Sequence, residues 1–517
     1  MIHHIELAGR ALALATDGTV TGPAAGPGIS AVAHPEGAPA APPGVQAVRV
    51  EAAHLSLLHD MREGEVYRTG QNSWSPSGWR RLDEAPMRIE DDERRRTADD
   101  DAWDDPVRHH SSWVAVLEDE GGAILVGCLE GPTPRLRADQ AALEAFTETG
   151  RPAQWVILAG PATVVLRDYA RALGQALGRR EIRPQSVWCS WYSYYEGISQ
   201  EALDEEIPEA AALGFATLQI DDGWQAAVGD WEAGPRFSRG MAHAAQQIRR
   251  AGMRPGLWVA PFIALPGSRL LAEHPEAFIH EADGRLAIAG SNWGADYHAL
   301  DATHPVAQDY VRRTIERIVK DWGFTYLKLD FINAAAVPGV RHGQADREGA
   351  YRIGLRLVRE AAGQEAFLLG SGALLMPSLG ILDAVRVGPD VAPMWENYAT
   401  DDLSDAKAYN ALHAGINRLW LGEVIGVDPD VVFFRHRRNL LDGTQMQWLR
   451  DVAEASRYRC LSDQSGWLDE QERAEIRQWL AREPEELEIL GRYRFRLGGR
   501  TVDLTEAIEG SASPYPL

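Results

Sequence analysis

From about residue 185 onward, short apolar runs alternate with longer segments in which apolar residues recur at helical spacing. Many apolar runs fill consecutive positions, as strands do when both faces of a sheet are covered. Strands are predicted at 186–191, 216–221, 254–262, 324–331, 366–370, 381–387, 416–421 and about 457–462. Helices are predicted at 201–213, 242–251, 305–321, 349–362, 401–414, 440–455 and 470–482. Eight such units over about 300 residues favour a (β/α)8 TIM barrel over an open sheet.

Residues 1–165 follow a different pattern, in which turn residues separate short β-prone runs and helical periodicity is weak. This pattern predicts an N-terminal antiparallel β-sandwich domain. A stretch rich in Ala, Gly and Pro within the first 50 residues favours turns and irregular segments. A linker helix is predicted at 166–183, the catalytic barrel at 184–483 and a short C-terminal β tail at 484–517. The predicted fold class is therefore α/β.

The formal net charge of −23 limits the kinds of ligand and partner that the protein is expected to bind. An acidic surface repels phosphate backbones and anionic lipid, so nucleic-acid and membrane roles are disfavoured, whereas a neutral substrate is compatible. No apolar window is long enough for a membrane span, and the N-terminus lacks the pattern of a signal peptide. Three cysteines give no disulfide framework, and no Cys/His spacing suggests zinc. We therefore expect a cytoplasmic protein without a metal site.

Catalytic groups in such barrels lie at the C-terminal ends of strands, so polar residues that end apolar runs are the candidates. The run 326–331 reads Tyr-Leu-Lys-Leu-Asp-Phe, which places Lys328 and Asp330 on one face of a strand. Buried charge is costly unless it is paired or functional. Lys328 would stabilise the charged form of Asp330, as a nucleophilic carboxylate requires. A structural ion pair is the alternative.

Carboxylates also end the second and sixth predicted strands. Asp221 and Asp222 precede Gly-Trp, and adjacent carboxylates can bind vicinal hydroxyl groups. Arg386 and Asp390 lie at the end of the sixth strand and in its loop. Asp330 and Asp390 come from separate strands and can converge on one bond, as glycoside hydrolysis requires. A turn without a catalytic role is the alternative.

Aromatic residues lie near the same strand ends. Trp191 and Tyr192 follow the first predicted strand, and Trp258 lies in the third. These side chains can wall a sugar pocket or pack the top of the barrel. A nucleotide enzyme is disfavoured because Tyr192-Ser-Tyr-Tyr-Glu-Gly stands where a glycine-rich phosphate-binding turn would be needed.

Taken in chain order, these motifs resemble the α-galactosidases of glycoside hydrolase family 36. They are Trp188-Cys-Ser-Trp-Tyr, Asp221-Asp-Gly-Trp, Arg254-Pro-Gly-Leu-Trp258, Lys328-Leu-Asp330 and Arg386-x-x-x-Asp390. The resemblance covers about residues 184–465 and extends weakly to Gly70-Gln-Asn-Ser-Trp74-Ser. The set is specific, whereas any one motif alone is not.

The resemblance implies a retaining α-galactosidase that hydrolyses terminal α-linked galactose from substrates such as melibiose and raffinose without a cofactor. It implies that Asp330 is the nucleophile and Asp390 the general acid/base. It also implies that Asp221 and Asp222 bind the 4- and 6-hydroxyl groups of galactose. The other implied substrate contacts are Lys328, Arg386, Trp258, Trp191, Tyr192 and, from the N-terminal domain, Trp74.

The chain departs from the family pattern at Ser371. Relatives often have a cysteine in this turn after the fifth strand, near the 2-position of the sugar, whereas this chain reads Gly370-Ser371-Gly372. We expect Ser371 to influence which 2-substituent is accepted, because a hydroxyl is the stronger hydrogen-bonding group. Transfer of galactose to another sugar and hydrolysis of α-N-acetylgalactosaminides are the alternatives. Non-catalytic sugar binding is less favoured because the pair of carboxylates is intact.

Overall fold

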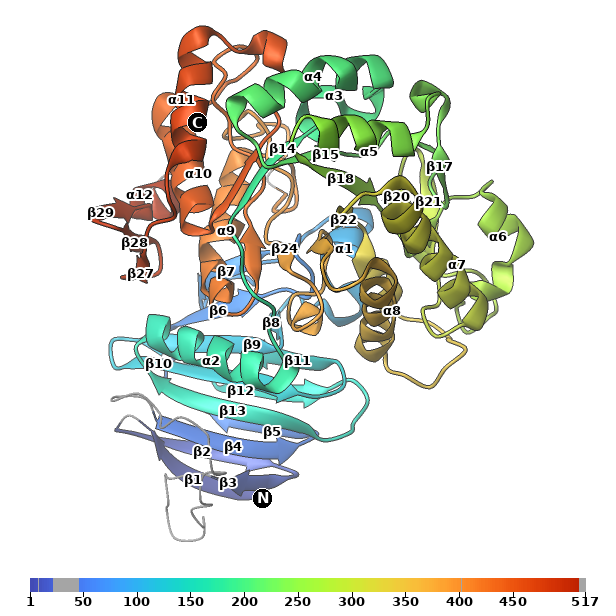
Figure 1. Cartoon of the computed structure of the whole chain (residues 1–517). Coiled ribbons are helices and arrows are strands. Elements are labelled where there is room, and N and C mark those ends of the chain that lie inside the picture. Colours follow the sequence, from blue (N-terminus) through green and yellow to red (C-terminus); the bar gives the residue numbers. More distant parts are fainter. Residues whose placement is uncertain (8, 22–45, 401, 511–517) are drawn as a thin grey trace.

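One part of the molecule is a barrel of eight parallel strands in the order β25-β24-β23-β22-β18-β15-β14-β26, above the N-terminal domain in the view of Figure 1. The computed structural model describes residues 1–7, 9–21, 46–400 and 402–510. The barrel strands are β14 (Gln185–Cys189), β15 (Thr217–Ile220), β18 (Arg254–Val259), β22 (Tyr326–Leu329), β23 (Phe367–Gly370), β24 (Ala384–Arg386), β25 (Gly426–Asp428) and β26 (Tyr458–Leu461). A parallel bridge between Val432 and Leu461 closes the ring. The predicted (β/α)8 barrel is confirmed.

Helices that follow the barrel strands cover the outside of the barrel (Figure 1). They are α4 (Gln200–Leu213), α5 (Met241–Arg250), α7 (Pro305–Glu316), α8 (Arg347–Ala362), α9 (Ala408–Asn417), α10 (Gly443–Ala455) and α11 (Glu470–Ala481). Polar residues define several starts: the side chains of Asp469 and Glu472 each accept from the other's backbone N–H at the start of α11. Such a capping box satisfies N–H groups that the first helical turn leaves free. The predicted helix 401–414 starts only at Ala408, and residue 401 lies outside the described residues.

The predicted strand at 416–421 is wrong. Helix α9 extends to Asn417, and a 3-10 turn follows at Leu419–Glu423. The apolar side chains of this run reach the core from helical turns. The seventh strand is β25 (Gly-Val-Asp), which is too short and too mixed in polarity to stand out as an apolar run in the sequence. Asp428 and Asp430 therefore lie at the C-terminal end of the seventh strand.

Two antiparallel sheets that share one core form the N-terminal sandwich. The first, in the order β1-β2-β5-β12-β11-β8, contains β1 (Ile2–Leu7), β2 (Arg10–Thr16), β5 (His54–Leu58), β8 (His109–Ser112), β11 (Pro134–Ala138) and β12 (Ala142–Thr147). The second, in the order β3-β4-β13-β10-β9-β6-β7, contains β3 (Thr19–Thr21), β4 (Gln46–Ala52), β6 (Glu65–Thr69), β7 (Ser77–Arg81), β9 (Val114–Asp119), β10 (Gly122–Glu130) and β13 (Ala153–Gly160). Burial alternates along β2, where Leu12 and Leu14 face the core. Most of the Ala/Gly/Pro-rich stretch, residues 22–45, lies outside the described residues.

Helix α2 (Ala162–Leu177) connects the sandwich to the barrel and lies across the second sheet (Figure 1). It starts at Ala162, ahead of the predicted linker at 166–183. Its buried face includes Tyr169, whose hydroxyl donates to the carbonyl oxygen of Cys128 at 2.8 Å. Gly127 in β10 permits this close approach, because a Cβ there would lie 2.3 Å from the Tyr169 ring.

One buried arginine fixes a loop of the sandwich against the barrel. The loop 70–76 joins β6 to β7. Arg418 donates to the carbonyl oxygen of Ser73 at 2.7 Å and to that of Val387, just past β24, at 2.8 Å. The backbone N–H of Ser73 donates to Ala373 in the barrel at 2.8 Å. Main-chain oxygens thus satisfy the buried guanidinium, and the loop is held at the C-terminal end of the barrel.

The predicted short C-terminal β region is a three-stranded sheet of β27 (Leu487–Ile489), β28 (Arg494–Leu497) and β29 (Arg500–Asp503), followed by α12 (Thr505–Glu509). The guanidinium of Arg492 lies 3.8 Å from the ring centre of Trp79 and forms ion pairs with Glu65 and Glu118. These contacts join the C-terminal sheet to the sandwich. Among the described helices, none is long and apolar enough to cross a membrane.

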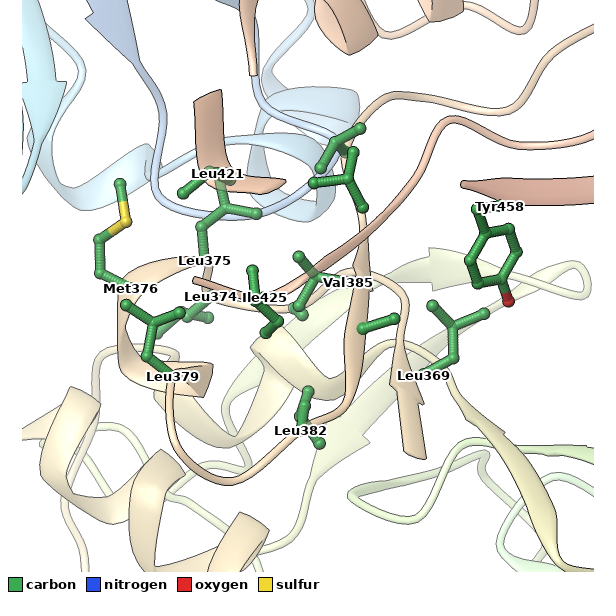
Figure 2. Packing of buried hydrophobic residues seen from close by; sticks show 14 of the residues in the cluster. Leu369, Leu374, Leu375, Met376, Leu379, Leu382, Val385, Leu421, Ile425 and Tyr458 are labelled. Atoms are coloured by element: carbon green, nitrogen blue, oxygen red, sulfur yellow. The ribbon is translucent and has the colours of Figure 1, made fainter. Parts of the chain in front are cut away.

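Leucine-rich packing supports β23, β24 and the segment between them (Figure 2). Leu382 is buried in this core, which also includes Leu379 and Val385 (Figure 2). A Cβ on Gly370 would lie 2.5 Å from Cδ1 of Leu382, so the core has no free space here. Because β24 ends with Arg386, this packing sets the position of a predicted site residue.

Leu382→Ala is expected to lower the free energy of unfolding by about 2–5 kcal/mol, because it leaves a cavity in a close-packed core. Leu382→Met keeps the volume and is expected to cost less than about 1.5 kcal/mol. Denaturant unfolding of both variants measures the difference. Equal stability of the two variants would contradict the packing described for Leu382.

Candidate active site

A cavity of about 530 Å³ opens at the C-terminal end of the barrel. Its wall includes residues directly past β15, β22 and β24, where barrels carry catalytic groups. Small-molecule sites usually have volumes of about 300–1,000 Å³. The predicted site residues that line this cavity are Trp74, Trp191, Asp221, Asp222, Trp258, Lys328, Asp330 and Asp390.

Three predicted site residues lie behind the wall. Arg386, Tyr192 and Ser371 are buried and are not among the described residues that line the cavity. Arg386 and Tyr192 donate to Asp430 instead. The backbone N–H of Ser371 donates to the carbonyl oxygen of Leu329 at 2.7 Å, which continues the pairing of β22 with β23. The predicted contacts of these three side chains with a sugar stay predictions.

Asp330 follows β22 directly and is held on both oxygens. Its Oδ2 accepts from Nε1 of Trp258 at 2.8 Å, and its Oδ1 from the backbone N–H of Phe331 at 2.9 Å. Strand register pairs Trp258 with Lys328, so the indole reaches the end of the neighbouring strand. Phe331 has a φ of 51°, and this left-handed turn directs the chain away immediately after the carboxylate. The carboxylate is thus fixed in the cavity wall.

Lys328 bridges carboxylates from two strands. Its Nζ lies 2.9 Å from Oδ2 of Asp221 and 3.9 Å from Oδ2 of Asp330. Burial lowers the pKa of Lys328, but the charges of Asp221 and Asp330 raise it by more, so the pKa lies above its ordinary value and the ammonium stays charged. Asp221 also accepts from Nε2 of Gln219, and its backbone N–H donates to Oγ of Ser190. Each buried charge in this cluster therefore has a partner.

Asp222 lies beside Asp221 but has no cationic partner within the described part of the chain. Its Oδ2 accepts from Nε1 of Trp293 at 2.8 Å, and its Oδ1 from Nε2 of Gln225. Burial raises the pKa of Asp222 to about 6; the two hydrogen bonds oppose this rise and the charge of Asp221 adds to it. Asp222 therefore titrates under mildly acidic conditions, and both aspartates can accept hydrogen bonds from vicinal hydroxyl groups when ionised.

Asp390 lies in the loop past β24 and has surroundings unlike those of Asp330. The side-chain exposed fraction is 42% for Asp390 and 10% for Asp330. Nη1 of Arg386 donates to Oδ1 of Asp390 at 3.0 Å and to Oδ2 of Asp430 at 2.7 Å. Burial lowers the pKa of Arg386, but neighbouring carboxylates, Asp430 foremost, raise it well above its ordinary value. Of the two predicted catalytic carboxyl groups, that of Asp330 is thus enclosed and that of Asp390 reaches solvent.

The sequence prediction missed Asp430. It lies just past β25 and is buried, and burial raises its pKa although the charge of Arg386 opposes the rise. Its φ of 81° is in the left-handed region, which costs about 1–3 kcal/mol and is common at functional sites. The seventh strand is predicted at 416–421, so the residues after the true strand β25 are not considered as strand-end residues. The acidic residues Asp428 and Asp430 after the apolar run 424–427 were the signal that could have found it.

Aromatic rings enclose another side of the cavity. The ring centres of Trp74 and Phe331 lie 5.2 Å apart in an edge-on arrangement, and Phe331 lies 5.1 Å from Trp293. Gly372, with a φ of 60°, makes room for Trp74, because a Cβ there would lie 2.7 Å from Cη2 of the indole. These large apolar faces suit a ligand that is apolar on one face and polar at its rim.

Helix α1 (Asp92–Ala98), from the sandwich side of the chain, forms an outer wall that the sequence did not indicate. Nη1 of Arg94 lies 3.3 Å from Oδ1 of Asp405 in the barrel. Asp100, just past the helix, lies 2.8 Å from Nη2 of Arg347 in α8, and this buried pair fixes the segment. No strand end or motif marks it. The other lining residues that sequence reasoning missed are Asp91, Glu93, Thr97, Ala98, Ser291, Asn292, Phe331, Pro389, Ser404 and Ala406.

Known proteins have the same fold and related sequences. Residues 170–360 match the family described as Melibiase. The α-galactosidase AgaA of Geobacillus stearothermophilus is 28% identical over 205 residues, which cover 37% of this chain and 27% of that protein. The α-galactosidase of Thermus thermophilus, solved with p-nitrophenyl α-D-galactopyranoside, is 35% identical with a TM-score of 0.86, over 98% of this chain and 99% of that one. This chain belongs to the glycoside hydrolase family 36 α-galactosidases.

The match to family 36 therefore extends well beyond the barrel motifs. The T. thermophilus enzyme has also been solved with stachyose, and there the TM-score is 0.82 at 35% identity, over 93% of this chain and 100% of that one. The sequence match to the curated relative, by contrast, spans about a quarter of that protein's length. The resemblance inferred from the motifs is confirmed.

In this family 36 chain, Asp222→Asn is expected to make stability less sensitive to pH. The folded-state pKa of about 6 lies above the ordinary value of 3.8. The unfolded chain therefore loses its proton first, and ionisation of Asp222 lowers stability progressively between those two pH values. The full cost, about 3 kcal/mol, applies above pH 6. The asparagine variant should gain about this much relative to the parent between pH 4 and pH 7.5.

Urea unfolding of both proteins at the two pH values measures this gain. Asp83→Asn is the control: the hydrogen bond with Arg81 lowers the pKa of exposed Asp83, so this group titrates below the two pH values and its substitution should leave the pH dependence of stability between them almost unchanged. A stability difference between parent and Asp222→Asn that does not change with pH would contradict the raised pKa.

Proposed function

We propose that this chain hydrolyses terminal α-linked galactose from short galactosides such as melibiose and raffinose, with retention of the anomeric configuration. One observation carries the proposal: Asp330 and Asp390, from the ends of different strands, line the same cavity. Double displacement at a glycosidic bond needs such a pair of carboxyl groups. The similarity to a T. thermophilus enzyme solved with an aryl α-galactoside and with stachyose supports the substrate class.

In the proposed mechanism Asp390 protonates the glycosidic oxygen while Asp330 attacks the anomeric carbon. The bond to the leaving group breaks, and galactose becomes covalently attached to Asp330. Asp390 then takes a proton from water, which attacks the same carbon and releases Asp330. The surroundings of the two groups support these roles: Asp330 is enclosed and fixed, whereas Asp390 reaches solvent, where water enters. The reaction itself requires no metal or organic cofactor.

In this proposal the galactose ring is bound by Asp221, Asp222 and Lys328, which form the floor of the cavity. Asp221 and Asp222 accept hydrogen bonds from the 4- and 6-hydroxyl groups, and the ammonium of Lys328 is available to a further hydroxyl. Trp258 and Trp74 supply the apolar walls. The support is the combination of buried carboxylates, one ammonium and indole faces around one cavity.

We also propose that the enzyme acts in the cytoplasm. The support is that Cys128, Cys189 and Cys460 are buried free thiols, the state that a reducing compartment maintains.

Asp330→Ala is expected to lower kcat on p-nitrophenyl α-D-galactopyranoside by about 10³-fold or more without loss of folding, because no covalent intermediate can form. Azide should then restore turnover by attacking from the vacated side, and the product should be β-galactosyl azide. Asp390→Ala is the matched variant: it still forms the intermediate, so azide should give α-galactosyl azide. Circular dichroism checks the fold. The opposite pair of azide products would exchange the two roles.

Hydrolysis of melibiose is expected to release α-galactose first, because two successive inversions retain the configuration. Proton NMR during the first turnovers measures the anomer before mutarotation. Initial release of β-galactose would exclude double displacement. Adding a free acceptor sugar in the same assay separates hydrolysis from galactosyl transfer, since transfer would give a new oligosaccharide in place of galactose.

A further inference from the structure

One carboxylate oxygen outside the cavity wall holds the loop that carries Asp390. Oδ2 of Asp430 accepts three hydrogen bonds: from Nη1 of Arg386 at 2.7 Å, from the backbone N–H of Val391 at 2.9 Å and from the hydroxyl of Tyr192. Two of these donors also hold Asp390. Arg386 also donates to Oδ1 of Asp390 at 3.0 Å, and Val391 is the next residue along the chain. Asp390 is thus held through both its side chain and its backbone.

Asp430 is itself firmly fixed. Its Oδ1 accepts from the backbone N–H of Val431 at 2.7 Å, and its own N–H donates to Oδ1 of Asp428 at 2.9 Å. The side chain is 2% exposed. The backbone at the end of β25 therefore fixes Asp430, whereas Asp390 lies on a loop and is partly exposed.

We propose that Asp430 is the positioning residue for the general acid, holding Asp390 at the glycosidic oxygen through Arg386 and Val391. This inference rests on the proposed function, in which Asp390 is the proton donor. Asp430 does not line the cavity, so it acts only through these neighbours. The geometry of proton transfer is demanding, since a misplacement of 1 Å can cost about 10²-fold in rate. General acid catalysis as a whole contributes about 10²–10⁴-fold.

The need for a correctly placed proton depends on the leaving group. A sugar alkoxide is a poor leaving group and requires protonation as the bond breaks, whereas p-nitrophenolate leaves without it. Loss of positioning at Asp390 should therefore harm melibiose far more than the aryl substrate. A loss of folded protein lowers both rates by the same factor, so the ratio of the two separates positioning from stability.

The test is Asp430→Asn, assayed for kcat/KM on melibiose and on p-nitrophenyl α-D-galactopyranoside. Asparagine suits the left-handed backbone and keeps the size of the side chain, but it has no negative charge to pair with Arg386 and only one acceptor oxygen. The kcat/KM for melibiose is expected to fall by about 10–100-fold, and the kcat/KM for the aryl substrate by less than about threefold. Asp463→Asn is the matched control, because it removes an equally buried carboxylate paired with Arg435; any loss there should be the same for both substrates.

An equal loss on both substrates in Asp430→Asn would overturn the inference. Tyr192→Phe, which removes one donor from the same oxygen, decides the matter if Asp430→Asn does not fold: a smaller but still selective loss on melibiose supports the inference, and a uniform loss overturns it. Asp390→Asn is the reference. If it shows no selectivity for the leaving group, the proposed role of Asp390 fails; if it is selective while Asp430→Asn is not, only the positioning role fails.

Discussion

The buried ammonium of Lys328 makes the floor of the cavity possible. Carboxylates from β15 and β22 cannot both leave water unless a positive charge lies between them. Lys328 provides that charge from inside the barrel, where its Nζ reaches both Asp221 and Asp330. The pairing of β18 with β22 then places Trp258 next to Lys328, and its indole N–H holds the carboxylate of Asp330. One ion cluster and the register of neighbouring strands thus determine the floor.

A second cation-centred cluster lies on the other side of the barrel. Arg386 faces the carboxylates of Asp390, Asp428 and Asp430, so a single guanidinium serves three acids. The two clusters differ in access to water, since Asp330 is enclosed while Asp390 reaches the solvent. A reaction that uses one carboxylate as nucleophile and another as proton donor needs such contrasting surroundings.

The barrel and the cavity floor could be predicted because strand ends are marked in the sequence. Asp221 and Asp330 each terminate an apolar run, and that local signal survives without knowledge of the fold. Asp430 is missed because the helical run at 416–421 is more strand-like in sequence than the short apolar run 424–427, which the acidic residues Asp428 and Asp430 follow. Arg94 belongs to a segment with no motif, and only tertiary packing brings it to the cavity. Local patterns thus predict what each strand carries, whereas residues from the other domain are predicted only where a family motif marks them, as at Trp74.

The loop 70–76 and helix α1 come from the sandwich yet form part of the cavity wall. The loop 70–76 is buried against the barrel, whereas the first turn of α1 is exposed, and exposed segments tolerate changes in length and sequence better than a buried core does. The residues that contact the outer part of a substrate can therefore differ between homologues while the barrel strands that carry the catalytic residues stay unchanged. A chimera that took only the exposed first turn of α1 from a homologue would keep the catalytic carboxylates and the buried contacts that support them, and would inherit a different selectivity.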